Sequence, residues 1–194
     1  MLKSDGTNNM PQHKAMLRQW MHQQLQAVDN AAIRQANLDI CKQLRQLPLL
    51  KQVNTVLAFA PLPNEIDIWP LLTELAYGPH RLCLPRLSGR GIMEARAVTD
   101  LSVLVYNHYH IAEPPLTAPL INPESIELVL VPGLAFTKDL WRLGRGGGYY
   151  DRFLAGCGAF RLGLAREIQI VEHIPHEQHD LRMQALLSEE SYYT

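Results

Sequence analysis

The sequence of 194 residues is poor in cysteine and contains no CxxC pair. Its three cysteines, Cys41, Cys83 and Cys157, are odd in number and lie far apart along the chain. This spacing argues against a disulfide framework and against a closed zinc site built from cysteines. We therefore expect three free thiols, buried or at the surface, in a reducing compartment.

Long apolar runs are also missing. The longest clean ones, residues 56–60 and 128–131, have the length of a strand. They are far shorter than the roughly 18 apolar residues that a membrane span requires. The N-terminal segment MLKSDGTNNMPQ is polar and lacks the apolar centre of a secretion signal. We expect a soluble, cytoplasmic protein that does not bind a membrane.

No charge of either sign dominates, since 18 Lys and Arg face 19 Asp and Glu. This balance disfavours nucleic-acid binding that depends on neutralising phosphates. Glycine and proline, at 12 and 13 residues, are close to average usage, which excludes collagen-like and low-complexity chains. The length suits one domain with a substantial core. We expect a flexible lead-in over residues 1–11 and a single domain over residues 12–194.

Short apolar runs alternate with segments of helical periodicity along the chain. Helices are predicted over residues 12–28, 67–76 and 149–155, and a further one after a cap at Asp29-Asn30. Strands are predicted over residues 54–60, 81–84, 92–98, 127–131 and 160–165, with Pro85 ending the second of them. The alternation indicates an α/β protein with a layered sheet.

The segment RLGRGGGYYDR, residues 142–152, is the most informative for function. Four glycines in the five positions 144–148 surround Arg145, after an apolar strand and before a predicted helix. Glycines let backbone N–H groups converge on an anion, and the start of a helix also favours phosphate. Arg142 and Arg145 are suited to contact phosphate oxygens, and Asp151 is suited to hold Mg²⁺.

Two common phosphate-binding patterns are absent from this segment. There is no GxxxxGK[ST], and GxGxxG fails because Tyr149 stands where its last glycine is required. A tight glycine-rich turn without a ligand is therefore the alternative interpretation. The crowding of arginines, tyrosines and an aspartate in one loop favours a ligand-binding loop over a turn without a ligand.

Outside this loop the candidate residues are ambiguous. Lys14 and Arg18 share one face of a predicted helix, where solvated charges are the common case. Glu65 follows a strand, where open α/β sheets place ligand groups, but a helix-capping acid is equally consistent with this position. His176-Glu177-Gln178-His179 is one residue short of the zinc-binding HExxH, and Pro175 disfavours a regular helix there. No GxSxG elbow is present.

The glycine-rich segment and the strand before it resemble a known family. LVLVPGLAF followed by RLGRGGGYYDRFL, between residues 128 and 154, resembles the 5-formyltetrahydrofolate cyclo-ligases, which are also called methenyltetrahydrofolate synthetases. Weaker matches are the pair Lys14 and Arg18 and the segments FAPLPNEID, Leu84-Pro85-Arg86, Ile111-Ala112-Glu113-Pro114 and His179-Asp180. Together they cover roughly residues 12–190.

The resemblance implies a ligase of one-carbon metabolism that forms a carbon–nitrogen bond. Such enzymes convert 5-formyltetrahydrofolate to 5,10-methenyltetrahydrofolate, use ATP and Mg²⁺, and release ADP and phosphate. The implied fold is a three-layer α/β/α sheet, similar to that of sugar-phosphate isomerases and CoA transferases. We expect a monomer, and the polyglutamate length of the preferred folate stays open.

The resemblance also implies roles for individual residues. Residues implied to bind ATP are Lys14, Arg18, Arg142, Leu143, Gly144, Arg145, Gly146, Gly147, Gly148, Tyr149 and Tyr150. Residues implied to contact the folate are Arg18, Ala60, Glu65, Tyr109, Arg145, Gly146, Gly147, Gly148 and Tyr149. Asp151 and Asp180 are the implied Mg²⁺ ligands. We expect Arg145 to be the catalytic residue, because it is placed to stabilise charge on the transferred phosphoryl group.

Three positions depart from the family pattern. Gly147 stands where some members carry a lysine, and Leu140-Trp141 replaces a common Gly-Asn. Gln184 replaces a common aspartate, which makes Asp180 the weaker of the two metal assignments. Two other functions remain as alternatives. One is a non-catalytic folate- or nucleotide-binding protein, and the other is a sugar-phosphate isomerase or acyl-CoA transferase of the same fold, which would need no ATP.

Overall fold

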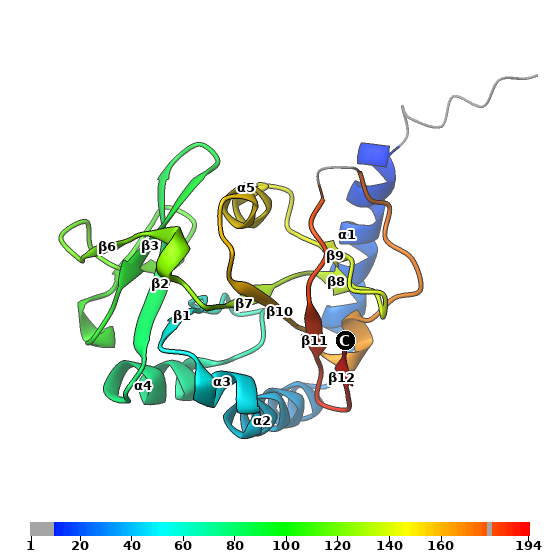
Figure 1. Cartoon of the computed structure of the whole chain (residues 1–194). Coiled ribbons are helices and arrows are strands. Elements are labelled where there is room, and N and C mark those ends of the chain that lie inside the picture. The colour runs from blue at the N-terminus through cyan, green and yellow to red at the C-terminus, as the bar shows by residue number, and fades with distance from the viewer. Residues whose placement is uncertain (1–9, 178–179) are drawn as a thin grey trace, which may run out of the picture.

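The computed structural model describes residues 10–177 and 180–194 and contains helices on both faces of a central sheet (Figure 1). The helices are α1 (Met10–Ala27), α2 (Asn30–Gln46), α3 (Pro48–Gln52), α4 (Trp69–Tyr77) and α5 (Tyr149–Ala155). The α5 bounds are those predicted, and the Asp29 carboxylate caps α2 by accepting from the N–H groups of Ala31 and Ala32. Residues 1–9 of the expected lead-in lie outside the described residues, while Met10 and Pro11 already belong to α1.

Eight strands form the main sheet in the order β12-β11-β10-β7-β1-β2-β3-β6. Their bounds are β1 (Thr55–Leu57), β2 (Arg81–Gly89), β3 (Ile92–Ala97), β6 (Leu120–Ile121), β7 (Leu128–Pro132), β10 (Phe160–Leu164), β11 (Ala185–Leu187) and β12 (Tyr192–Tyr193). The five strands from β11 to β2 pair in parallel, and antiparallel strands complete both edges. Two small hairpins are separate: β4 (Val105–Tyr106) with β5 (Ala112–Glu113), and β8 (Ala135–Phe136) with β9 (Arg142–Leu143).

The central strands are apolar throughout because both faces of the sheet are covered. On β7, Leu128 and Leu130 pack into a core with α2, α3 and α4, whereas Val129 and Val131 face a second core that contains Leu154 of α5. Figure 1 shows α2, α3 and α4 on one side of the sheet and α5 on the other. The predicted α/β class is confirmed, and the more specific likeness to sugar-phosphate isomerases stays a prediction.

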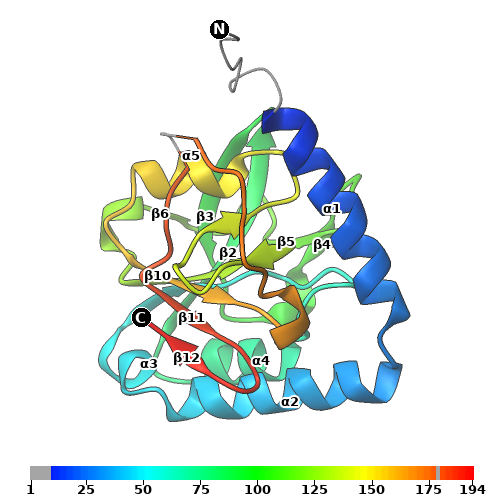
Figure 2. The ribbon, with the colours of Figure 1, turned by 90° about the vertical axis from the view of Figure 1, so that its right-hand side faces the viewer.

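Helix α1 packs on the β8–β9 hairpin instead of on the main sheet. Its buried residues Met21 and Leu25 share a third core with Leu134, Leu143 and Ile174. Figure 2 shows α1 running along one side of the molecule, while α2 lies across the opposite end from α5. This docking places the N-terminal half of α1 beside the segment that follows β9.

One predicted strand end is wrong. Pro85 does not end β2, which continues to Gly89 with Pro85 opposite Ala95 of β3. The pairing of β2 with β1 stops at Cys83, so no neighbouring strand needs an N–H group from Pro85 on that side. The N–H of Leu87, two residues further on, donates to the Glu113 side chain instead.

The three cysteines are buried, free thiols. Burial raises the pKa of Cys41 to about 11 and that of Cys83 to about 12, so both stay protonated and unreactive at neutral pH. Among the helices of the described residues, none is long and apolar enough to cross a membrane.

Candidate active site

A cavity of about 470 Å³ opens at the carboxyl ends of β1, β2 and β7. The chain leaves β1 toward β2 on one side and leaves β7 toward β10 on the other, so the connections diverge at this point of the sheet. Such a switch point is where open α/β sheets bind ligands, and the volume is in the range of small-molecule sites. Phe59 and Ala60 after β1, and Pro132 and Gly133 at the end of β7, form its floor.

The glycine-rich segment between β9 and α5 forms one wall of the cavity. Gly146 and Gly148 have φ angles of 102° and 65°, a conformation that L side chains rarely adopt. At Gly147 a side chain is disfavoured for a different reason, since a Cβ atom there would lie 2.8 Å from the Tyr149 ring. The lysine that some family members carry would therefore need Tyr149 to move.

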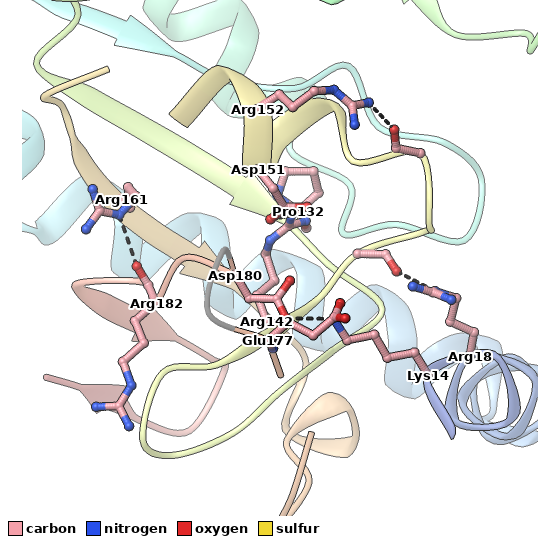
Figure 3. A network of polar contacts seen from close by, with 12 residues as sticks. Lys14, Arg18, Pro132, Arg142, Asp151, Arg152, Arg161, Glu177, Asp180 and Arg182 are labelled. Atoms are coloured by element: carbon pink, nitrogen blue, oxygen red, sulfur yellow. Dashed lines mark hydrogen bonds and ion pairs between the residues drawn. The ribbon is translucent and has the colours of Figure 1, made fainter. Parts of the chain in front are cut away.

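Helix α1 contributes Lys14 and Arg18 to the same region (Figure 3). The Arg18 Nε donates to the Gly144 carbonyl at 2.9 Å, which ties α1 to the glycine-rich segment. Partial burial lowers the pKa of Arg18, while Asp151 and Asp180 act in the opposite direction. Both carboxylates are thus close enough to Arg18 to act on its pKa.

Lys14 is not a solvated surface charge. Its side chain is 13% exposed, and its Nζ lies 2.6 Å from Asp180 Oδ2 and 3.4 Å from Glu177 Oε2. The N–H of Glu177 also donates to Asp180 Oδ2. The ion pair joins the N-terminal helix to the C-terminal segment. It therefore brings a predicted phosphate-binding cation against a predicted metal ligand.

Arg142 lies at the bottom of the cavity with only 4% of its side chain exposed. It donates to the Pro132 carbonyl at 3.1 Å and to Asp151 Oδ1 at 2.7 Å (Figure 3). Its guanidinium also lies over the Tyr150 ring. Burial raises the pKa of Tyr150 well above its ordinary value, so the hydroxyl stays protonated.

Two polar atoms in this part of the cavity are buried without a partner among the described residues: Arg142 Nε and the Tyr150 hydroxyl. Buried donors are rarely left unpaired in native proteins, and a bound ligand or water satisfies them in most cases. Both residues line the cavity, so the two unpaired atoms are consistent with a polar ligand at the base of the glycine-rich segment.

Glu65 faces the glycine-rich segment across the cavity. Its Oε1 accepts from Arg145 Nε at 2.8 Å, and its Oε2 accepts from the Leu62 N–H at 3.0 Å. Glu65 is therefore not the cap of α4, which begins at Trp69. The pair joins the predicted catalytic arginine to the predicted folate-binding carboxylate.

A buried arginine that the sequence did not single out holds the Glu65 loop. Arg166 follows β10 and donates to the carbonyls of Asn64 and Glu65, at 3.3 and 2.7 Å, and to Asn37 Oδ1. Its only sequence signal is a charged residue directly after the buried strand FRLGLA. That signal does not reveal which carbonyls the guanidinium reaches.

Ala60 and Tyr109 complete the predicted folate side, and both line the cavity. Tyr109 lies between β4 and β5, where Asn107 Oδ1 accepts from its N–H at 2.8 Å. Buried Glu113 accepts from Asn107 Nδ2 and from the Leu87 N–H, which anchors this hairpin to β2. Lys14, Arg18 and Asp180 are not part of the cavity lining itself. Arg18 contacts the glycine-rich segment at Gly144, and Lys14 pairs with Asp180.

The residues fit a magnesium ion that is shared with a phosphate ligand. No group of three or more His, Cys, Asp or Glu side chains able to hold a metal occurs within residues 10–177 and 180–194. Asp151 and Asp180 can supply one or two carboxylates, which is what Mg²⁺ ordinarily takes from a protein when phosphates and water complete its shell. His179 of the HExH segment lies outside the described residues, and His176 stacks on Trp141.

The comparisons agree with this geometry. A model of the 5-formyltetrahydrofolate cyclo-ligase family matches residues 10–189. A probable 5-formyltetrahydrofolate cyclo-ligase of Schizosaccharomyces pombe is 28% identical over 91% of this chain and 95% of its own length. The cyclo-ligase of Escherichia coli K12 is 31% identical over 73% of this chain and 81% of its own length.

A solved structure has the same architecture. Aquifex aeolicus 5,10-methenyltetrahydrofolate synthetase superimposes with a TM-score of 0.84 at 28% identity, over 93% of this chain and 91% of that one. With the family model spanning all strands of the main sheet except β12, the chain belongs to the 5-formyltetrahydrofolate cyclo-ligase family.

Proposed function

We propose that this protein converts 5-formyltetrahydrofolate to 5,10-methenyltetrahydrofolate and couples the cyclisation to the conversion of ATP to ADP and phosphate. The observation that carries the proposal is the shared cavity. The glycine-rich segment with Arg142 and Arg145 lines one side, and Glu65, Ala60 and Tyr109 line the other. An anion-binding wall thus faces a wall suited to an aromatic, hydrogen-bonding ligand.

The chemistry explains why a phosphate donor is needed. The formyl group on nitrogen 5 is an amide, and its oxygen is a poor leaving group. In the proposed mechanism this oxygen attacks the γ-phosphorus of ATP and ADP departs. Nitrogen 10 then adds to the activated formyl carbon. The methenyl bridge forms as the C–O bond to phosphate breaks and the proton of nitrogen 10 leaves with the phosphate. No protein nucleophile is required, so the protein contributes position and charge.

The contacts of each charged residue indicate its role in this mechanism. Arg145 is more exposed than Arg142, at 37% against 4% of the side chain, and its Nε donates to Glu65. We infer that it turns to the transferred phosphoryl group, which releases Glu65 to accept hydrogen bonds from the pterin. Arg142, fixed by Pro132 and Asp151, keeps its charge at the base of the cavity. Magnesium held by Asp151 and Asp180 would neutralise phosphate charge.

An absorbance assay tests the proposal directly. Purified protein is mixed with 5-formyltetrahydrofolate, ATP and Mg²⁺, each omitted in turn, and the absorbance band of the methenyl product is followed. We expect the band to rise only in the complete mixture. Binding of ATP by calorimetry without any rise would favour a non-catalytic binding protein. Turnover of a sugar phosphate or an acyl-CoA without ATP would favour the isomerase or transferase alternative.

We also propose that the protein acts in the cytoplasm as a monomer, without nucleic acid or a membrane. Size-exclusion chromatography with light scattering, with and without both substrates, tests the oligomeric state. A stable dimer at enzyme concentrations that support turnover would contradict it.

The metal assignment makes a separate prediction. Asp151→Asn and Asp180→Asn should each raise the Mg²⁺ concentration that gives half-maximal rate, by about tenfold or more, because each removes a negatively charged oxygen ligand. We expect the larger effect for Asp151. Titrating the rate with Mg²⁺ at saturating ATP measures it.

The matched control is Asp139→Asn, since Asp139 is an exposed aspartate that pairs with Arg182 at 3.3 Å and does not line the cavity. It should leave the Mg²⁺ dependence unchanged. An unchanged Mg²⁺ requirement in Asp151→Asn would remove this residue from the metal site.

A further inference from the structure

Arg152 on α5 makes contacts that the proposed mechanism does not use. Its Nε donates to the Gly91 carbonyl at 2.8 Å. A terminal nitrogen of the same guanidinium donates to the Gly147 carbonyl in a close hydrogen bond, and Figure 3 shows the Arg152 side chain turned toward the glycine-rich segment. The guanidinium also lies 5.8 Å from the centre of the Tyr149 ring. One side chain thus joins the turn between β2 and β3 to the glycine-rich segment.

The backbone around this guanidinium is shaped to receive it. A Cβ atom at Gly91 would lie 2.5 Å from one terminal nitrogen of Arg152, and one at Gly148 would lie 2.6 Å from the other. Both glycines also have positive φ, 78° and 65°. The planar fork of an arginine can donate to two carbonyls at once, which a lysine ammonium cannot reproduce with the same geometry.

The contact with Gly147 orients a peptide unit of the glycine-rich segment. In a trans peptide the carbonyl oxygen and the following N–H point in opposite directions. With the Gly147 carbonyl turned toward Arg152, the N–H of Gly148 points away from it. Gly147 and Gly148 both line the cavity, where converging N–H groups are the ordinary means of binding a phosphate.

The two elements at one end of the Arg152 contacts, α5 and the β2–β3 hairpin, are packed against each other. Leu154 of α5 and Met93 of β3 belong to the same buried core, so α5 and the β2–β3 hairpin cannot shift independently without disturbing it. On the other side, Arg18 holds the carbonyl of Gly144. The segment is therefore held by one arginine at each end, from two different helices.

We propose that Arg152 is a positioning residue that keeps the Gly146–Gly148 backbone in the conformation that receives the phosphates of the nucleotide. The inference rests on the proposed use of ATP. It assigns to Arg152 an indirect role, through the peptide unit between Gly147 and Gly148, in a chain that has no lysine within the glycine-rich segment.

The test compares Arg152→Ala and Arg152→Lys with Arg161→Ala. Arg161 is a suitable control because it is a partly exposed arginine whose Nε also donates to a backbone carbonyl, that of Arg182 at 3.0 Å, away from the cavity. Calorimetry measures binding of Mg²⁺ with a non-hydrolysable ATP analogue. We expect the dissociation constant to rise about tenfold in Arg152→Ala and in Arg152→Lys, and to stay at the wild-type value in Arg161→Ala.

A second readout does not depend on turnover or on nucleotide. Amide hydrogen exchange of the segment 144–149 in the free protein should be about tenfold faster in both Arg152 variants than in the wild type and in Arg161→Ala. If wild-type protein fails to bind the analogue, the proposed function fails while the exchange rates still decide the role of Arg152. Unchanged exchange in Arg152→Ala, or wild-type behaviour of Arg152→Lys in both measurements, would overturn the inference.

Gly91, in the turn between β2 and β3 that Arg152 contacts, offers an independent variant. Gly91→Ala places a methyl group against the guanidinium and should reproduce the effect of Arg152→Ala on both readouts. Its matched control is Gly89→Ala in the same hairpin, where the nearest atom would be 3.5 Å away in ordinary contact. Equal behaviour of Gly91→Ala and Gly89→Ala would also contradict the bridge.

Discussion

Replacing Arg145 by alanine is expected to lower kcat by about 10³-fold, because a single arginine positioned on a transferred phosphoryl group contributes at least that much in related reactions. The side chain lies within the cavity, and its Nε is 2.8 Å from Glu65. It is exposed enough to be removed without opening the core. Steady-state rates of methenyl formation at saturating substrates measure the effect.

Two further variants separate the roles of the Arg145–Glu65 pair. If Arg145 acts only by holding Glu65, then Arg145→Ala, Glu65→Gln and the double variant should have similar rates. If Arg145 acts on the phosphoryl group, the double variant should be slower than either single one, and Glu65→Gln should mainly raise the KM for the folate. Near-normal kcat in a folded Arg145→Ala enzyme would exclude the catalytic role.

Replacing Arg166 by alanine is expected to lower the free energy of unfolding by about 3 kcal/mol, since hydrogen bonds made by a charged group contribute roughly 1.5–3 kcal/mol each. The side chain is 3% exposed and donates to the carbonyls of Asn64 and Glu65 and to the side chain of Asn37. Its loss removes a buried side chain and takes the donor away from these three oxygens, which lie at the edge of the buried region. Denaturation by urea, followed by circular dichroism, measures the difference.

Arg45→Ala is the control for this measurement. Arg45 makes a bidentate contact with Glu74, but both side chains are well exposed, so its removal should cost no more than about 1 kcal/mol. Because Arg166 anchors the loop that carries Glu65, Arg166→Ala should also raise the KM for the folate more than that for ATP. Equal losses of stability in the two variants would contradict the buried role of Arg166.

The fold was predictable where local patterns decide it. Strands β1, β7 and β10 are apolar runs because both faces of the sheet are covered, and α5 follows a glycine run that cannot continue a strand. Strand β11 was not predicted, because Ala185–Leu187 is only three residues long and pairs with β10 across twenty intervening residues. The ending of β2 at Pro85 was wrong, because the effect of a missing N–H depends on whether a neighbouring strand needs it.

In the candidate site, too, local features were predictable from the sequence and tertiary contacts were not. The sequence predicted the glycine-rich loop and named the cations and carboxylates near it. It could not predict that Lys14 faces Asp180 or that Arg145 faces Glu65, because these partners are 166 and 80 residues apart. It also left Arg152 and Arg166 unnoticed, since nothing adjacent in the chain shows which carbonyl a long guanidinium will reach.

The amino-acid sequence by itself determined the α/β alternation, the helix at residues 149–155 and the loop of glycines before it. These depend on short-range sterics and on the period of apolar residues, both of which are local. Only the tertiary structure decided which charges meet. Helix α1 docks on the β8–β9 hairpin and the carboxyl ends of β1 and β7 adjoin, so chain segments far apart in sequence supply one another's hydrogen-bond partners. Long side chains take the orientation that their hydrogen-bond partners impose. Those partners become neighbours only when the chain has folded.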